Sequence, residues 1–310
     1  MKRIVSISIG SSKRDHQAVV EITGQEYQIE RIGTDGSLTE AVNKIKSLDG
    51  KVEAFGMGGI DLYIWAGKRP YVIREALKLK NAAIKSPIVD GSGLKNTLER
   101  RVISYLQDNK IIDFNNKQVL ITSAMDRFGM AETLDKLGAN LTIGDLIFGL
   151  GINKPIYSLK QLAVIARAAA PIVCKLPFKW LYPTGSQQND IIKGRFDEYY
   201  QKATIIAGDF HYIKRYMPLD LKDKIIITNT LTNGDLVDLK SRGVKILVST
   251  TPELHGRSFG TNVMEALLVS ILKERRVKVS PENYDGLIDE LKFMPRVEFL
   301  QENPRVNKSS

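Results

Sequence analysis

Hydrophobic and polar positions follow a strand-like pattern over the first thirty-three residues of the chain. The last two of three short apolar runs are separated by Gly24-Gln25, a dipeptide typical of tight turns. The chain therefore begins with a predicted β-hairpin or meander. Its three strands are expected at residues 4–10, 17–23 and 26–33.

A helical period replaces this pattern at residues 37–48, where the apolar residues recur on one face. Ser37 can cap the helix, and Glu40 three residues later completes a capping-box pattern. Further elements then follow up to a polar stretch at 108–118, which contains an Asn-Asn turn and predicts a domain boundary. The expected elements are strands at 52–59, 60–67 and 87–91 and helices near 74–85 and 94–107.

The second half of the chain shows a regular alternation of apolar strands and helices. The strands are almost entirely apolar, which predicts burial on both faces and a largely parallel sheet. This pattern is typical of a doubly wound, Rossmann-like domain. The strands are expected at 118–123, 139–145, 203–209, 224–230 and 244–250, and the helices at 128–138, 157–173, 234–243 and 261–276.

The predicted fold class is therefore α/β with two domains. An N-terminal mixed α/β domain, 1–112, could form the substrate side. A Rossmann-like nucleotide-binding domain follows at 113–280, and 281–310 form a C-terminal helix and tail.

Composition restricts the class of protein. The single cysteine, Cys174, excludes an internal disulfide and a cysteine-based zinc site, and we expect a reducing, cytoplasmic setting. The longest apolar run, 162–178, is interrupted by Arg167, Pro171 and Lys175, so no membrane span is expected. The net charge is +10, but acidic residues are interspersed with the basic ones along the chain. The expected partner is therefore a small-molecule substrate, with no specific nucleic acid and no membrane. A homodimer is also compatible with the sequence.

The turn between the strand at 118–123 and the next helix is the candidate nucleotide site. If Gly129 is the third glycine of a dinucleotide fingerprint, Ala124 and Asp126 hold the first two positions, and a carboxylate there would repel a pyrophosphate. Asp145 lies 21 residues after Ala124. At this spacing in dinucleotide-binding folds, an acidic residue accepts hydrogen bonds from the ribose hydroxyls. Alternatively, Asp126 caps the helix and Asp145 is a loop residue. The candidate cofactor-binding residues are Ser123, Ala124, Arg127, Phe128, Gly129, Met130, Asp145, Asn229 and Thr230.

Polar loops after strands supply candidates for holding an anionic group of a substrate. The first loop offers two hydroxyls and two cations directly after a strand. Two histidines and an arginine lie in loops expected after later strands, although each histidine could equally be structural. No closely spaced ligand motif supports a metal site. The anion-binding candidates are Ser11, Ser12, Lys13, Arg14, His211, His255 and Arg257.

The segment 90–97 carries the candidate acid/base chemistry. Asp90 leaves a strand, and Lys95 lies at a helix start. A lysine and an aspartate that meet in a cleft between domains could act as an acid/base pair on a hydroxyl that loses hydride. The predicted catalytic residues are Lys95 with Asp90 or Asp61.

The segments IGSSKRDH, RIGTDG, GMGGIDLY, VDGSGLKNTLERR, DRFGMAE, WLYPTG, AGDFHYIKRYMP and TTPELHGRSFGTNVMEA resemble, over nearly the whole chain, a bacterial protein group labelled quinate 5-dehydrogenase. The resemblance implies a two-domain protein with a Rossmann cofactor domain. It also implies oxidation of the C5 hydroxyl of quinate, or of a similar cyclic polyol acid, with NAD or NADP. The substrate motif, N-T-D motif and glycine-rich turn of shikimate and quinate dehydrogenases are absent, so no catalytic residue is carried over.

The function expected from the sequence is an NAD(P)-dependent oxidoreductase acting on a hydroxyl of a small cyclic polyol carboxylic acid. Two alternatives remain open. One is a transferase that uses a nucleotide or S-adenosylmethionine at the same turn, and the other is a non-catalytic nucleotide- or metabolite-binding protein. Asp126 favours the alternatives, whereas the spacing to Asp145 favours the oxidoreductase.

Overall fold

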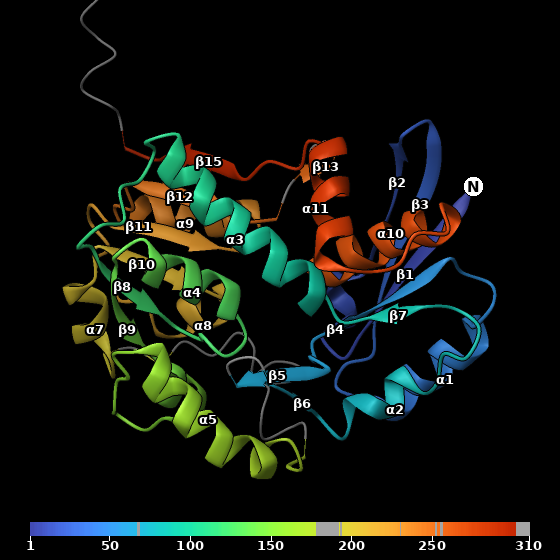
Figure 1. Ribbon diagram of the computed structural model, residues 1–310, viewed down its shortest axis with the longest axis horizontal. Helices are drawn as coiled ribbons and strands as arrows, with labels where there is room; N and C mark the ends of the chain where they lie inside the picture. The colour runs from blue at the N-terminus through green and yellow to red at the C-terminus, as the bar shows by residue number, and fades with distance from the viewer. Residues whose placement is uncertain are drawn as a thin grey trace, which may run out of the picture.

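The structure is a computed structural model with two separate parallel-rich sheets, each accompanied by helices (Figure 1). This two-domain α/β architecture, with a Rossmann-like second domain, confirms the predicted fold class. The structure describes residues 1–66, 69–177, 192, 194–229, 231–251, 253–254 and 257–301.

The first sheet has the strand order β2-β3-β1-β4-β7. Strands β3, β1, β4 and β7 are parallel, and β2 pairs antiparallel with β3. The predicted hairpin is thus present, and Gly24 at φ 77° forms its turn, but β1 pairs with β3 rather than continuing a meander. The strands are β1 (Lys2–Ser8), β2 (His16–Ile22), β3 (Gln25–Gly33), β4 (Ala54–Gly58) and β7 (Ile88–Val89).

The helices of this half begin where the sequence predicts them. The Ser37 hydroxyl accepts a hydrogen bond from the Glu40 amide at 3.2 Å and caps α1. The helix predicted at 74–85 is shorter, because the Asp49 carboxylate binds the backbone N–H groups of residues 84–86 outside it. The helical elements are η1 (Ser12–Arg14), α1 (Leu38–Leu48), α2 (Ala76–Lys80) and α3 (Ser92–Asp108), and a small hairpin is formed by β5 (Tyr63–Ala66) and β6 (Arg69–Val72).

The second sheet has the order β15-β12-β11-β10-β8-β9. All its neighbours are parallel except β15, which the sequence did not predict and which pairs antiparallel with β12. The chain passes from β8 to β9 on one side and then to β10 on the other, so β8 and β10 flank a topological switch point. The strands are β8 (Gln118–Ile121), β9 (Asn140–Ile143), β10 (Ile205–Gly208), β11 (Ile225–Thr228), β12 (Ile246–Ser249) and β15 (Arg296–Phe299).

One prediction about this half was wrong. The segment after β10, expected to be a loop, is the helix α8, and Asp209 caps it by accepting the His211 amide at 2.9 Å. Its Phe210, Ile213 and Tyr216 are buried at helical spacing. The other helical elements are α4 (Phe128–Lys136), η2 (Asp145–Gly149), α5 (Leu159–Val173), α7 (Asp197–Lys202), α8 (Phe210–Tyr216), α9 (Asn233–Ser241), α10 (Thr261–Glu274) and α11 (Pro281–Glu290), and β13 (Glu253–Leu254) pairs with β14 (Arg257–Ser258).

The last two helices return to the first half of the molecule. Helix α10, buried continuously from Val263 to Leu272, packs against β1, β4 and α3, and α11 packs against α3 (Figure 1). These contacts join the end of the predicted second domain, 113–280, and the C-terminal helix to the first half of the molecule. A helix that is apolar nearly all round must be covered on several sides, and the first sheet together with α3 provides that cover.

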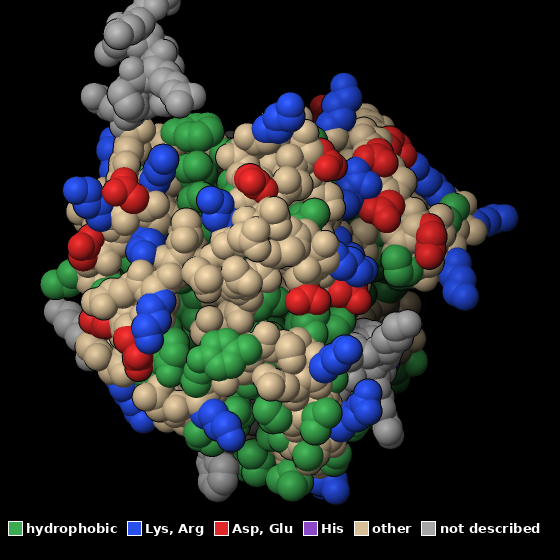
Figure 2. Space-filling view, turned by 60° about the vertical axis from the view of Figure 1, so that its left-hand side comes forward, with side chains coloured by type: hydrophobic (Ala, Val, Ile, Leu, Met, Phe, Trp, Pro, Cys, Tyr) green, Lys and Arg blue, Asp and Glu red, His purple; other side chains and the backbone are tan. Residues whose placement is uncertain are grey.

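The visible surface in Figure 2 carries Lys and Arg side chains scattered among Asp and Glu, and apolar side chains gather toward its lower side. Helix α5 exposes Val164 and Ile172. Within the described part of the chain, the helices lack the combination of length and apolar character that a membrane span requires.

Candidate functional site

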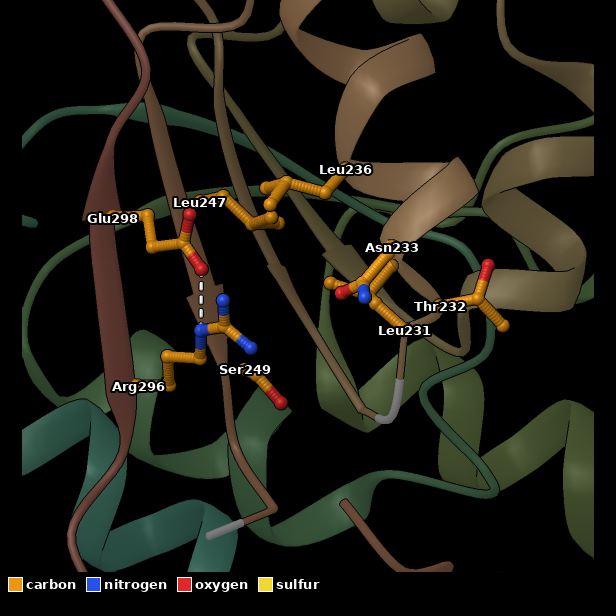
Figure 3. Close-up of a pocket in the computed structure, with 8 residues that line it drawn as sticks. All are labelled: Leu231, Thr232, Asn233, Leu236, Leu247, Ser249, Arg296 and Glu298. Carbon is orange, nitrogen blue, oxygen red and sulfur yellow. Dashed lines mark ion pairs between the residues drawn. The ribbon is translucent and has the colours of Figure 1, made fainter. Parts of the chain in front are cut away.

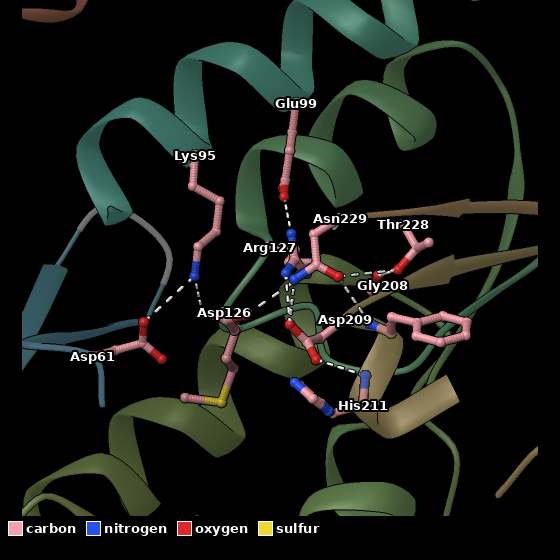
Figure 4. A network of polar contacts seen from close by, with 12 residues as sticks. Asp61, Lys95, Glu99, Asp126, Arg127, Gly208, Asp209, His211, Thr228 and Asn229 are labelled. Atoms are coloured by element: carbon pink, nitrogen blue, oxygen red, sulfur yellow. Dashed lines mark hydrogen bonds and ion pairs between the residues drawn. The ribbon is translucent and has the colours of Figure 1, made fainter. Parts of the chain in front are cut away.

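The carboxyl ends of strands from the two sheets meet at a network of charged side chains (Figure 4). Asp61 follows β4, and Lys95 lies in the first turns of α3, which begins just after β7. Asp126 lies in the turn between β8 and α4. In open α/β sheets, ligands bind outside the carboxyl ends of the strands, so the network occupies the position expected for a site.

Lys95 lies between two carboxylates. Its Nζ is 2.5 Å from Asp126 Oδ1 and 3.4 Å from Asp61 Oδ1. The side chain of Lys95 is 10% exposed, whereas those of Asp61 and Asp126 are 19% and 24% exposed. Burial by itself would lower the pKa of Lys95, but the two carboxylates outweigh it and raise the pKa above its ordinary value. Lys95 is therefore held as a cation, beside carboxylates that remain partly accessible.

Arg127 forms a second set of ion pairs, of which the pair with Glu99 is fully enclosed. Its guanidinium pairs with Glu99 on α3 and, at 2.9 Å, with Asp209, and the side chains of Arg127 and Glu99 are each 2% exposed. Asn229 Nδ2 donates to the same Asp209 oxygen at 2.8 Å. Burial opposes ionisation of Asp209, but Arg127 outweighs it and lowers the pKa of that carboxyl; burial raises the pKa of Glu99.

The spacing of these residues connects one helix to one turn. Lys95 and Glu99 are four residues apart and so share a face of α3, while their partners Asp126 and Arg127 are consecutive. Gly129 permits this approach, because a Cβ there would lie 2.5 Å from the backbone oxygen of Asn96. The one glycine of the predicted fingerprint thus serves close packing of α4 against α3.

Asp145 faces the turn between β8 and α4 rather than solvent. Its two carboxylate oxygens accept the backbone N–H groups of Ala124 at 2.8 Å and Met125 at 2.9 Å. Burial, opposed by these amides, raises the pKa of Asp145 to about 6. Two amides of the predicted phosphate-binding turn are therefore already occupied by a carboxylate of the chain.

The remaining predicted cofactor residues lie around this turn. Ser123 and Phe128 are partly exposed, whereas Met130 is fully buried in the apolar core. Asn229 also accepts the Phe210 amide at 3.0 Å. Thr230 lies outside the described residues.

The predicted anion loop at 11–14 forms contacts within the chain. The Ser12 amide and hydroxyl donate to Asp35 at 2.8 and 2.6 Å, and Ser11 accepts the Lys13 amide at 3.2 Å. Lys13 and Arg14 are exposed. A chain carboxylate thus binds groups that were expected to bind an anion.

The other predicted anion contacts are separate from that loop. His211 is exposed on α8 beside the network, where its charge would favour the ionised form of Asp209 (Figure 4). His255 and the side chain of Arg257 lie outside the described residues.

Of the three predicted catalytic residues, the structure brings Lys95 and Asp61 together but gives Asp90 other partners. Asp90 accepts the Leu62 amide at 2.7 Å and the Ser92 hydroxyl at 2.7 Å, so it holds the start of α3. The sequence analysis missed Asp126 as the closest partner of Lys95. The i, i+4 spacing of Lys95 and Glu99 was the available signal, but it does not identify which turn faces the helix.

A surface pocket lies elsewhere, beside the edge strand β15 (Figure 3). Arg296 and Glu298 on β15 form an ion pair at its side. None of the predicted site residues lines it. Its lining is Leu231, Thr232, Asn233, Leu236, Leu247, Ser249, Arg296 and Glu298. In the parts of the chain that the structure describes, no group of three or more His, Cys, Asp or Glu side chains could hold a metal ion.

Family models account for most of the chain. One, described as "Domain of unknown function (DUF8754)", matches residues 93–300, which include Lys95, Glu99, Asp126, Arg127 and Asp209. The chain belongs to this family. A second model, "Domain of unknown function (DUF8753)", matches residues 3–90, which include Asp61. The DUF8754 match thus contains all members of the network except Asp61. No curated protein matches the chain.

Several solved structures share a distant likeness with the chain. Glutamate dehydrogenase from Thermus thermophilus has 11% identity and a TM-score of 0.45, with 93% of this chain and 72% of that chain covered. An NAD-dependent malic enzyme from Thermotoga maritima has 14% identity and a TM-score of 0.37, with 90% and 73% covered. A glucose-galactose binding protein from Geobacillus stearothermophilus has 9% identity and a TM-score of 0.38, with 98% and 99% covered. Likeness at this level does not bear on activity.

Proposed function

We propose that the protein is an NAD(P)-dependent oxidoreductase that acts on a hydroxyl of a small molecule. The observation that carries this proposal is Lys95, a cation between Asp61 and Asp126 where carboxyl ends of the two sheets meet. An ammonium group beside two partly accessible carboxylates can stabilise an alkoxide and pass on its proton.

In this proposal the charge of Lys95, which its two carboxylate partners maintain, determines the roles within the network. Because Lys95 is already protonated, it donates to the substrate oxygen and stabilises the negative charge that develops there. The proton of the hydroxyl passes to Asp126 or Asp61, the carboxylates in contact with the ammonium. In the reverse direction the carboxyl returns this proton to the oxygen of the reduced product, and Lys95 stays protonated and stabilises the alkoxide.

The turn between β8 and α4 has features that suit a nicotinamide dinucleotide. It lies at the switch point, and α4 begins without a side-chain cap on its first amides, within the described region. Asp126 is directed to Lys95, so its charge is compensated rather than turned toward a phosphate. Ser123, Phe128 and Asn229 would contact the cofactor, which would supply the hydride acceptor.

The proposed substrate is a cyclic polyol carboxylic acid of the quinate or shikimate type. The resemblance to the group labelled quinate 5-dehydrogenase supports this class. Lys13 and Arg14, exposed after β1, are the described cations that we propose for its carboxylate. Their loop follows the carboxyl end of β1 in the same sheet as the Asp61 loop.

Asp145 favours a second candidate, a transferase that binds S-adenosylmethionine or another nucleoside at the same turn. Its carboxylate occupies the amides of Ala124 and Met125, and this leaves fewer donors for a pyrophosphate than for a nucleoside without one.

Calorimetric titration with NAD, NADP, S-adenosylmethionine and ATP separates the two candidates. The proposal expects binding of NAD or NADP, followed by formation of NAD(P)H with quinate, shikimate or a related polyol acid. Binding of S-adenosylmethionine alone would support the transferase. If neither nicotinamide cofactor binds at millimolar concentration, the oxidoreductase proposal is wrong.

A further inference from the structure

The first turn of α3, which leads directly to Lys95, lacks a cap from its own N-cap residue. That residue is Gly91, at φ 92°. Asp90 accepts the Ser92 amide at 3.0 Å, and the Lys95 amide donates to the Gly91 carbonyl at 2.8 Å. The remaining amides of this turn need a partner, because helix N-termini leave their first N–H groups without one.

A carboxyl from another helix lies against this turn. Glu265, on α10, is 4% exposed, and a Cβ added to Gly93 would lie 2.4 Å from its Oε1. Tyr284 on α11 donates its hydroxyl to the same oxygen at 2.8 Å. Glu265 Oε2 is buried and has no hydrogen-bond partner among the described residues. The α10 side chain that lies closest to Gly93 is therefore an ionisable one.

The surroundings of Glu265 bring the pKa of its carboxyl close to neutral pH. Burial raises its pKa to about 7, the Asp90 carboxylate adds to this shift, and the amides of Gly91 and Leu94 oppose it. The titratable groups that act on it are Asp90, before α3, and Tyr284, on α11. Strand β4, which also packs against α10, contains no titratable side chain.

We propose that Glu265 is a positioning residue for Lys95, and that gain or loss of its proton resets the first turn of α3. The turn connects to both sides of the site. The backbone N–H of Lys95 donates to the Gly91 carbonyl within this turn. The Asp90 carboxylate also accepts a hydrogen bond from the backbone N–H of Leu62, the residue after Asp61. A change at this turn therefore alters the distance between the ammonium and its carboxylates. The inference rests on the proposed role of Lys95, but its test does not require turnover.

The test is an NMR titration of the full chain from pH 5.5 to 8.5, read at the amides of Gly91 and Gly93 and at the Lys95 side chain. In the unaltered protein these signals should shift together with a midpoint near 7. Glu265→Gln should abolish the shift. Glu274→Gln, the same change at the exposed end of α10, should leave it intact. A midpoint that persists in Glu265→Gln, or that is absent from the unaltered protein, would overturn the inference.

Tyr284→Phe provides an independent variant if Glu265→Gln does not fold. It keeps the carboxyl but removes a hydrogen bond that favours the ionised form, so the midpoint should move to higher pH. An unchanged midpoint would contradict the inference. Asp145, another carboxyl whose pKa is raised, is monitored at the amides of Ala124 and Met125.

The proposed activity gives a separate readout. If NAD(P)H forms, Glu265→Gln should remove the inflection of kcat near pH 7 and leave the KM for the cofactor unchanged. A titration of α3 without any turnover counts against the proposed function alone. Turnover without the titration counts against the positioning role alone.

Discussion

Two ion pairs join α3 to the turn between β8 and α4, and they differ mainly in access to solvent. The pair of Arg127 and Glu99 is sealed, with both side chains 2% exposed. The pair of Lys95 and Asp126 lies one helical turn away, with 10% and 24% of the side chains exposed. One helix face thus carries an enclosed pair and a reachable pair.

Because of this difference, we expect one pair to stabilise the structure and the other to take part in the reaction. A sealed pair cannot contact a substrate, and the cost of desolvating it is recovered only while both partners remain. A reachable pair can exchange its proton with a bound molecule. We therefore assign the fixing of α3 to Arg127 and Glu99, and the reaction to Lys95 and Asp126.

Removal of one member of the sealed pair should have the largest effect. Glu99→Ala leaves the Arg127 guanidinium buried with one carboxylate partner fewer, which should lower the free energy of unfolding by about 3 to 5 kcal/mol. Urea unfolding followed by circular dichroism measures this loss. The triple variant Glu99→Leu, Arg127→Met and Asp209→Asn should recover much of it, since Glu99, Arg127 and Asp209 then leave no unpaired charge. A loss below about 1 kcal/mol in Glu99→Ala would contradict the assignment.

Neutralising the carboxylate of the reachable pair should lower kcat more than it lowers the free energy of unfolding. Asp126→Asn keeps the shape and a hydrogen bond to Lys95 but removes the nearer of the two proposed proton acceptors, so kcat should fall roughly 100-fold. The free energy of unfolding should fall by less than in Glu99→Ala, because Asp61 still pairs with Lys95 and Asp126 is partly solvated. Loss of folding with no loss of rate per folded molecule would reverse the two roles.

The carboxyl of Asp209 should make the sealed pair sensitive to acid. Its folded pKa lies below the unfolded value of 3.8, so its stabilising contribution is present above about pH 4 and is lost as the pH falls through the folded pKa. Asp209→Asn should therefore reduce the fall in Tm between pH 5 and pH 3. Differential scanning calorimetry on both proteins checks this, and parallel Tm curves would show that Asp209 contributes nothing to the acid sensitivity.

A more exposed ion pair, between α3 and α4, should have the smallest effect. Arg100 on α3 pairs with Glu132 on α4, with side chains 31% and 30% exposed. Arg100→Ala should cost less than about 1 kcal/mol in urea unfolding, because solvent screens such a pair. A cost equal to that of Glu99→Ala would mean that burial does not distinguish the pairs.

Local patterns predicted much of the fold. The Ser37 cap, the hairpin at Gly24 and the parallel apolar strands depend on neighbouring residues, and the structure contains all three. The edge strand β15 was missed because its four residues lie in a polar segment without strand periodicity. Helix α8 was missed because its charged residues resembled a loop.

The site was harder to predict because it depends on pairing between distant segments. The sequence pointed to Lys95 and Asp61, which lie 34 residues apart and are brought into contact. It treated Asp126 as an obstacle to a phosphate, whereas the structure shows it as the partner of Lys95. No periodicity within either segment reveals which helix face lies against which turn.

The most direct test of the central claim is the rate of NAD(P)H formation by the unaltered protein and by Lys95→Met. Methionine preserves much of the length of the side chain but removes the ammonium. We predict turnover of a polyol acid by the unaltered protein and a loss of at least about 100-fold in kcat for the variant, with an unchanged calorimetric Kd for the cofactor. Equal kcat values in the two proteins would contradict the assignment of the reaction to Lys95 and Asp126.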